Sequence, residues 1–185
     1  MAEYYLISQL PSLDGINENA PVPITQERFL ELCSRFLGKK ALAELNKLTL
    51  LPLRAYEKSS SSVIELWNAG ERNLRMVLAK LRADKMNKHS EYDIQAFPVG
   101  LVQTARAAIE IDSPMEAEKF LFRYRLDFLE TLRPMDSFSE EFVFYYGLKL
   151  KLIEHIRSFN SQSGENAYRN IYSSIVNGER TEVIR

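Results

Sequence analysis

Apolar residues recur at steps of three and four along one uninterrupted segment, residues 62–86, and this pattern constrains the fold most. The members of this stripe are Val63, Leu66, Trp67, Gly70, Leu74, Val77, Leu78 and Leu81. Such spacing predicts one face of an α-helix. At about 1.5 Å per residue the helix is about 37 Å long, enough to cross a small domain. We therefore expect it to be the central element of the chain.

Local signals agree with this helix. Ser62 precedes the apolar run and Glu65 follows three residues later, which predicts a capping box at the N-terminus. Two oppositely charged pairs are four residues apart, Glu71 with Arg75 and Lys80 with Asp84. Each such pair stabilises an exposed helix by about 0.2–0.5 kcal/mol.

The second half of the same helix is basic. Between Glu71 and Lys88 there are six Lys and Arg residues against two acids. A solvated helix face is the simpler interpretation, and an interface for an acidic partner is the alternative. On that alternative the candidate interface residues are Arg72, Asn73, Arg75, Arg82, Lys85 and Lys88.

The rest of the chain also predicts helices. Thr25 caps a helix that Gly38 ends, Ser113 with Pro114 opens one that ends near 132, and Ser137 with Glu140 opens another. Further helices are expected at 39–51, 99–111 and 165–176, and the run 4–7 is either helical or extended. Because Gly and Pro number only seven each, a turn-rich β-sandwich is disfavoured. We predict an all-α multi-helix bundle of about seven helices.

Residues 87–98 form the best candidate boundary. They divide the chain into an N-terminal helical subdomain, 1–88, and a C-terminal helical subdomain, 89–185. One continuous domain remains the alternative.

No residue pattern typical of an active site is present. Cys33 is the single cysteine, and the two histidines, His89 and His155, are far apart, so neither a zinc site nor an internal disulfide is expected. Phosphate-binding glycine loops and the nucleophile elbow are missing. Cys33 falls on an apolar helix face, as a buried thiol would. We expect no catalytic residues, no cofactor and no metal.

Charge and hydropathy narrow the cellular setting. The net charge is −1, which does not favour a general nucleic-acid-binding protein. The N-terminus lacks the pattern of a signal peptide, and no stretch approaches the ~20 apolar residues that span a bilayer. We expect a cytoplasmic chain without a membrane span, able to dock peripherally on a membrane complex.

Two stretches resemble known families. The start, Tyr4 to Leu13, followed by Pro21 to Thr25 and a Phe- and Leu-rich helix, resembles a bacterial family of unknown function encoded among V-type ATP synthase genes. The run Glu71 to Arg75, with the residues up to Lys80, is similar to a helix of the V-type ATPase central-stalk subunit, called C or d. That helix carries an Asn-Leu-(Lys/Arg) sequence.

The resemblance implies an all-helical protein without an active site that links the rotating shaft of the catalytic head to the membrane rotor ring. Its implied partners are therefore V-type ATPase subunits. The central-stalk subunit is longer and has three related bundles, whereas this chain has room for about two. It is accordingly either a shortened stalk subunit or a paralogue that binds elsewhere.

Three functions are weighed on these grounds. The first is a non-catalytic subunit or accessory protein of a V-type ATP synthase. The second is a free-standing helical adaptor that binds a soluble protein. The third is an enzyme whose site is assembled from dispersed residues such as Tyr124, Arg125 and His155.

Overall fold

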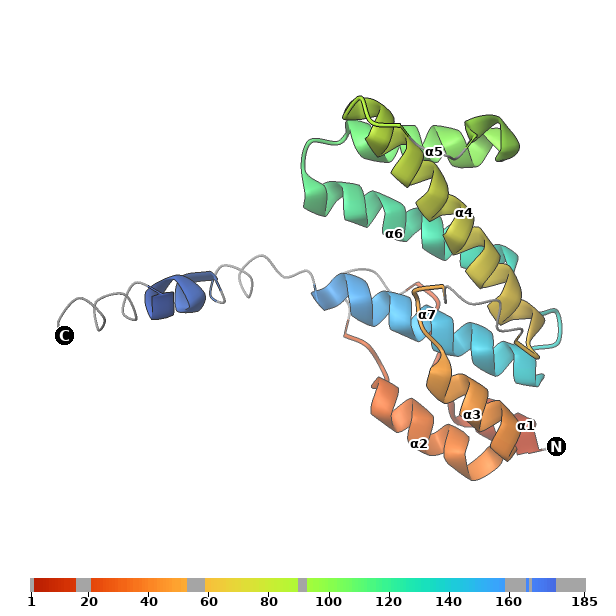
Figure 1. The fold of residues 1–185 in the computed structure, drawn as a ribbon. Coiled ribbons are helices and arrows are strands. Elements are labelled where there is room, and N and C mark those ends of the chain that lie inside the picture. Colours follow the sequence, from red (N-terminus) through yellow and green to blue (C-terminus); the bar gives the residue numbers. More distant parts are fainter. Residues whose placement is uncertain are drawn as a thin grey trace.

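The computed structural model describes residues 2–15, 21–52, 59–89, 93–158, 166 and 168–175 (Figure 1). Every regular element in these residues is helical, which confirms the predicted all-α multi-helix bundle. Residues 168–175 are also helical and are called the tail helix below. The other elements are α1 (Ala2–Gln9), α2 (Gln26–Phe36), α3 (Lys39–Lys47), α4 (Ser62–Lys85), the 3-10 turn η1 (Ile94–Ala96), α5 (Val99–Glu110), α6 (Pro114–Thr131) and α7 (Glu140–Ser158).

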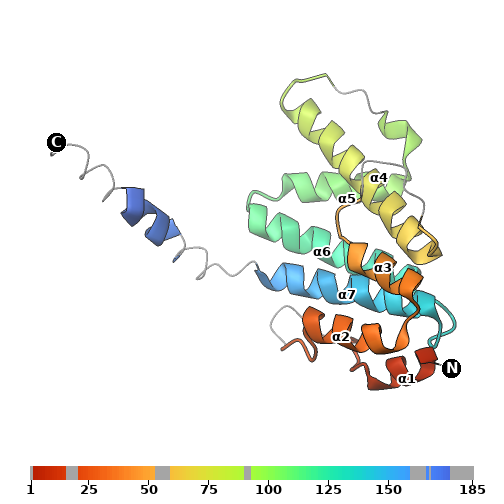
Figure 2. The same cartoon turned by 60° about the horizontal axis from the view of Figure 1, so that its bottom comes forward.

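Helix α7, rather than α4, is the most enclosed element. It contacts α2, α3, α4 and α6, and it lies between α1–α3 on one side and α4–α6 on the other (Figures 1 and 2). All residues from 143 to 150 are buried. A helix that is apolar on every face is expected in such a position. The α4 stripe predicted from the sequence is nevertheless buried at most of its positions.

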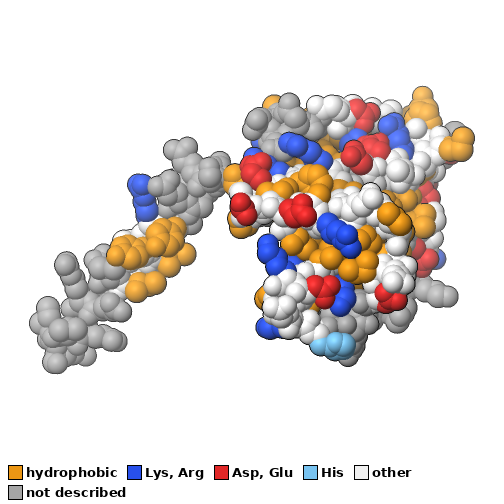
Figure 3. All heavy atoms as spheres, turned by 90° about the horizontal axis from the view of Figure 1, so that it is seen from above, with side chains coloured by type: hydrophobic (Ala, Val, Ile, Leu, Met, Phe, Trp, Pro, Cys, Tyr) orange, Lys and Arg blue, Asp and Glu red, His pale blue; other side chains and the backbone are white. Residues whose placement is uncertain are grey.

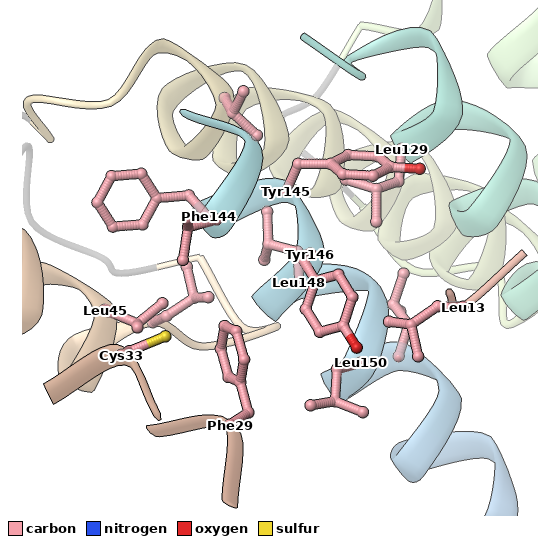
Figure 4. Packing of buried hydrophobic residues seen from close by; sticks show 14 of the residues in the cluster. Leu13, Phe29, Cys33, Leu45, Leu129, Phe144, Tyr145, Tyr146, Leu148 and Leu150 are labelled. Atoms are coloured by element: carbon pink, nitrogen blue, oxygen red, sulfur yellow. The ribbon is translucent and has the colours of Figure 1, made fainter. Parts of the chain in front are cut away.

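The aromatic residues of α7 explain how one helix supports both sides. Phe144 points toward Leu45 of α3, while Tyr145 points the opposite way and lies beside Leu129 of α6 (Figure 4). Tyr146 packs against Phe29 of α2, with ring centroids 5.2 Å apart. These aromatic residues therefore belong to the core on both sides of α7.

The buried apolar residues form two clusters. The larger cluster joins α1–α3, the first half of α4, the second half of α6 and α7. The smaller one joins the second half of α4, from Leu74 onward, to α5 and to Leu121 of α6. Helix α4 is shared by both clusters. The larger cluster draws on both sides of residue 88, and the division into subdomains 1–88 and 89–185 stays a prediction.

Two predicted helix starts are displaced by one or two residues. The cap of α4 is Ser61, whose hydroxyl accepts from the Ile64 amide at 3.3 Å, and Ser62 is already helical. The cap before α7 is formed by Ser139, whose hydroxyl accepts from Phe142, and not by Ser137. Thr25 and Ser113 cap α2 and α6 as predicted.

A distant carboxylate accounts for the register at the start of α4. Glu141 of α7 accepts from the Ser61 hydroxyl at 2.8 Å, the Ser62 amide at 3.2 Å and the Val63 amide at 3.1 Å. Negative charge is stabilising at a helix N-terminus, where amides lack partners in the helix. Glu141 therefore fixes both the first turn of α4 and its position against α7.

Candidate interaction surface along helices α4 and α6

Glu71 is the centre of a buried ion-pair network between α4 and α6. Its side chain is only 2% exposed, and its two oxygens accept three N–H groups. Arg75 Nε lies 2.7 Å from Oε1, one helical turn away. Arg125 of α6 reaches both oxygens, with Nε 3.0 Å from Oε2 and Nη2 3.1 Å from Oε1. A bidentate arginine of this kind is strong and directional.

Arg125 is fully engaged in this network. Its Nη1 lies 3.2 Å from Oε1 of Glu118, which is seven residues earlier on α6. Burial alone would lower the pKa of the Arg125 guanidinium, but the hydrogen bonds and charge of Glu71 and Glu118 outweigh burial and raise that pKa. Arg125 therefore stays charged, and its ion pair with Glu71 holds α6 against α4.

The network forms one wall of a hollow of about 530 Å³, called the central hollow below. Leucines, a phenylalanine and an isoleucine form the apolar part of its walls, and charged and polar side chains form the rest. The hollow is lined by Gln26, Leu48, Thr49, Leu50, Leu51, Glu71, Arg75, Glu118, Phe122, Arg125, Lys151, Leu152, Glu154, His155, Ile156 and Ser158. It therefore lies where the start of α2, the segment 48–51 after α3, α4, α6 and the last turns of α7 meet.

Two smaller hollows continue from it along the seam between α4 and α6. One, of about 290 Å³, shares Arg75, Glu118 and Arg125 with the central hollow. The other, of about 380 Å³, shares Arg82 with the first and also includes Lys85. Because neighbouring hollows share residues, they form one groove, called the α4/α6 groove below.

The structure brings three of the six predicted interface residues to this groove. Arg75 and Arg82 line it on the α4 side, and Lys85 lies at its far end, where Nζ donates to the Ile109 carbonyl at 3.4 Å. Lys88 is exposed just beyond the end of α4.

Arg72 and Asn73 differ from the other four. Both are half-buried on α4, and neither is among the residues that line the three hollows. The predicted surface is therefore narrower than the sequence indicated. It consists of Arg75 in the groove and of the basic end of α4, defined as Arg82, Lys85 and Lys88.

Sequence reasoning missed the long-range half of the network. The pairs Glu71–Arg75 and Lys80–Asp84 were predicted from their spacing, and both form, at 2.7 and 2.8 Å. Glu71 is nevertheless buried, because Arg125, 54 residues later, closes over it. No local spacing reports such a partner.

A second buried ion was also missed. Lys149 of α7 donates to Asp14 and to Glu130 of α6, each at 2.7 Å. The hydrogen bond from Lys149 lowers the pKa of the Asp14 carboxyl, although burial opposes it. Both acids are distant from Lys149 in the sequence, so no local spacing predicts these pairs.

The residues considered for catalysis do not assemble into one site. His155 and Arg125 both line the central hollow, but Tyr124 packs instead against the smaller apolar cluster. Cys33 is buried, and burial raises the pKa of its thiol to about 12. Within the described residues, no group of three or more His, Cys, Asp or Glu side chains is placed to hold a metal ion.

No helix in the described part of the chain combines the length and apolar character that a membrane crossing requires. Comparison of the chain with protein-family models, with curated proteins and with solved structures finds no match in any of the three. The resemblance to V-type ATP synthase proteins therefore rests on residues 4–37 and 71–80 alone.

Proposed function

We propose that this chain is a non-catalytic subunit or accessory protein of a V-type ATP synthase, which couples the catalytic head to the membrane rotor by shape and rigid packing. The host complex is proposed on the resemblance of residues 4–37 and 71–80. The observation that carries the docking role is the row Arg75, Arg82 and Lys85 along one groove, with Lys88 beyond it.

The rigid attachment of α4 to α6 and α7 supports this role. Transmission of force between two bodies needs helices that do not slide past each other. Helix α4 is fixed at its start by Glu141 of α7 and in its middle by the ion pair between Glu71 and Arg125 of α6. Hydrogen-bonded networks of this kind rigidify a fold when every member is satisfied.

The charge of the basic end of α4 suggests the chemistry of the partner surface. The basic end of α4 is exposed, with Arg82 and Lys85 in the last turn of the helix and Lys88 just beyond it. Cations at an exposed rim mainly steer an acidic partner and set its orientation, and their effect weakens as salt increases. We therefore propose an acidic docking surface on the stalk or rotor side.

The test is a pull-down of the tagged full chain from native membranes, with V-type ATP synthase subunits identified by mass spectrometry. We expect these subunits to be recovered at low salt and to be released as salt rises. In the variant Arg82→Glu, Lys85→Glu, Lys88→Glu, recovery should fall at least about tenfold, because rim charges of the wrong sign repel the partner.

The matched control carries the same change in charge on α3, as Lys39→Glu, Lys40→Glu, Lys47→Glu. These three residues are exposed and lie at the other end of the molecule from the end of α4 (Figure 1). The control should behave as the wild type does. Equal recovery by both triple variants would reject the basic end of α4 as the docking surface. Failure of the wild-type chain to recover any ATP synthase subunit at low salt would reject the host.

A free-standing helical adaptor is the second candidate function, and the tail helix favours it. Tyr168, Ile171, Tyr172 and Ile175 are all exposed on this short helix. Exposed apolar faces of this type commonly engage a groove on another surface. The same pull-down separates the two functions, because an adaptor would recover a soluble protein from the cytosolic fraction and no ATP synthase subunit.

A further inference from the structure

The tail helix carries an apolar face that no part of the bundle covers. Its four large apolar residues, Tyr168, Ile171, Tyr172 and Ile175, are spaced by three, one and three. This spacing places them on one side of a helix. Figure 3 shows hydrophobic side chains gathered on this helix, which stands clear of the body. The rings of Tyr168 and Tyr172 stack, with centroids 6.1 Å apart.

Such a helix is not expected to persist without a surface to pack on. Isolated helices shorter than ~12–15 residues are marginal in water, and most helical stability in proteins comes from packing of the apolar face. The tail helix spans residues 168–175, about two turns. On its polar side, the hydroxyls of Ser173 and Ser174 donate to carbonyls of their own helix.

The central hollow offers the matching surface next to the point where the tail begins. Ile156 and Ser158, in the last turn of α7, line the hollow themselves. Leu48, Leu50 and Leu51 form an apolar wall beside them. The volume of about 530 Å³ lies within the ~300–1,000 Å³ typical of pockets that enclose small ligands.

The chemistry of the hollow fits tyrosine in particular. Tyrosine buries an apolar ring while its hydroxyl keeps a polar partner. The exposed side chain of Leu51 lines the hollow. The Arg75 guanidinium, whose side chain is 45% exposed, offers donors to it, while Glu71 and Arg125 are already paired with each other. Rings from Tyr168 and Tyr172 would pack on the leucines and direct their hydroxyls to Arg75.

We propose that the tail helix docks in the central hollow of its own chain. Nine residues separate Ser158 from Tyr168, counted as 168 − 158 − 1. At ~3.3–3.6 Å per residue they span at most about 30 Å, enough to turn back to a hollow that begins at Ser158. A short tether gives an effective concentration of about millimolar, so the chain's own tail outcompetes a second copy at micromolar concentration.

The other large hollow is a poorer host for the same helix. It has a volume of about 440 Å³, and no residue of α7 lines it. Glu44 within it already accepts from the Ser60 amide at 2.8 Å and from the hydroxyls of Ser59 and Ser60. The polar groups at its rim are thus already paired, whereas the central hollow presents the exposed side chain of Leu51. The inference concerns the isolated chain and is independent of the host complex.

Amide hydrogen exchange of the purified full chain tests the proposal. We expect exchange in the tail helix to be slowed at least about tenfold relative to a synthetic peptide of residues 159–185, and equally at low and high protein concentration. Leu51→Asp, at an exposed position on the rim, and Ile171→Asp, on the tail, should each restore fast exchange.

Ser173→Asp is the matched control, because it adds the same charge to the polar side of the tail helix and should leave the slow exchange unchanged. Thermal unfolding of Leu51→Asp verifies that the body is folded, and Ile171→Asp cannot disturb the body at all. Tail amides that exchange as fast as those of the peptide would overturn the proposal. Protection that appears only at high concentration would overturn it in favour of a second copy. Protection that survives Leu51→Asp would place the tail elsewhere.

Discussion

Replacement of Glu71 by glutamine tests the ion-pair network that joins α4 to α6. Glu71→Gln keeps the shape of the side chain but removes its charge. Arg75 is 45% exposed and can be hydrated by water after the change. Arg125 is only 12% exposed; it loses the carboxylate charge and one of the two acceptor oxygens, because glutamine has a single carbonyl oxygen, and it keeps Glu118 at 3.2 Å. The cost therefore falls mainly on Arg125.

The expected loss of stability follows from this difference in exposure between Arg75 and Arg125. Removal of one partner of a buried pair costs about 3–5 kcal/mol, because a charge is left in the interior without compensation. Since Glu118 still neutralises part of the Arg125 charge, we expect the lower end of that range, about 3 kcal/mol. Surface pairs contribute about 1 kcal/mol or less. Glu31→Gln, which removes an exposed carboxylate from Arg28 and Arg35, is therefore the control.

Urea unfolding followed by the fluorescence of Trp67 supplies the free energies. Trp67 is the single tryptophan and is 1% exposed, packed beside Phe128. The slope of unfolding free energy against urea should be the same in all variants, so that the midpoints compare stability directly. A loss below about 1 kcal/mol in Glu71→Gln would refute the buried-network argument, since only an exposed pair is that weak.

A double variant separates charge from packing. Glu71→Leu combined with Arg125→Met removes both buried charges and keeps apolar volume. Because a well-packed apolar pair can replace a buried ion pair with little loss, we expect the double variant to be more stable than Glu71→Leu alone. If the double variant loses as much as the two single variants added together, Glu71 and Arg125 do not act as a unit.

Three further predictions use the same unfolding assay or a simple chemical probe. Gly70→Ala should destabilise the protein although alanine favours helix, because an added Cβ would lie 2.3 Å from the Phe128 ring; Gly70→Ala combined with Phe128→Leu should recover part of the loss. The pKa of the Asp14 carboxyl is lowered in the folded protein, so the unfolded chain binds its proton more readily, and the contribution of Asp14 to stability is lost as pH falls through that pKa. In Asp14→Asn, the free energy of unfolding should therefore fall less steeply as the pH is lowered into the acid range, which is called the acid limb below. Cys33, with a thiol pKa of about 12, should react with a thiol reagent only as fast as the protein opens.

Each of these has an outcome that contradicts it. An unfolding midpoint of Gly70→Ala above that of the wild type would mean that the Phe128 ring moves aside freely. An acid limb of Asp14→Asn identical to the wild type would assign the acid sensitivity to other carboxyls. Cys33 labelling that is unaffected by stabilising the fold would show that the thiol is accessible in the native state. Gly100→Ala, where an added Cβ meets nothing within 4 Å, serves as the glycine control.

The sequence predicted the helices well because periodicity and caps are local. Thr25, Ser113 and the apolar stripe of α4 are read within a few residues, and the structure uses them as expected. Ser61, and not the predicted Ser62, caps α4 because Glu141, about 80 residues away, binds the start of this helix. Local sequence patterns do not report such a distant partner.

The candidate surface was predicted only in part, for a similar reason. A run of charges on one helix shows which cations are present but not which neighbours enclose them. Lys85 and Arg82 lie along the groove because α5 and α6 pack beside α4, while Glu71 is enclosed because Arg125 closes over it. The sequence likewise did not predict the enclosure of α7, since residues 142–148 are apolar on every face and leave no distinct stripe.

The most direct test of the proposed function is to mix the purified full chain with purified V-type ATP synthase from the same source and to follow both by size-exclusion chromatography. The proposal predicts co-elution at low ionic strength, progressively lost as salt screens the basic end of α4, and absent for Arg82→Glu, Lys85→Glu, Lys88→Glu. Elution of the wild-type chain alone at low ionic strength, with the ATP synthase intact, would contradict it.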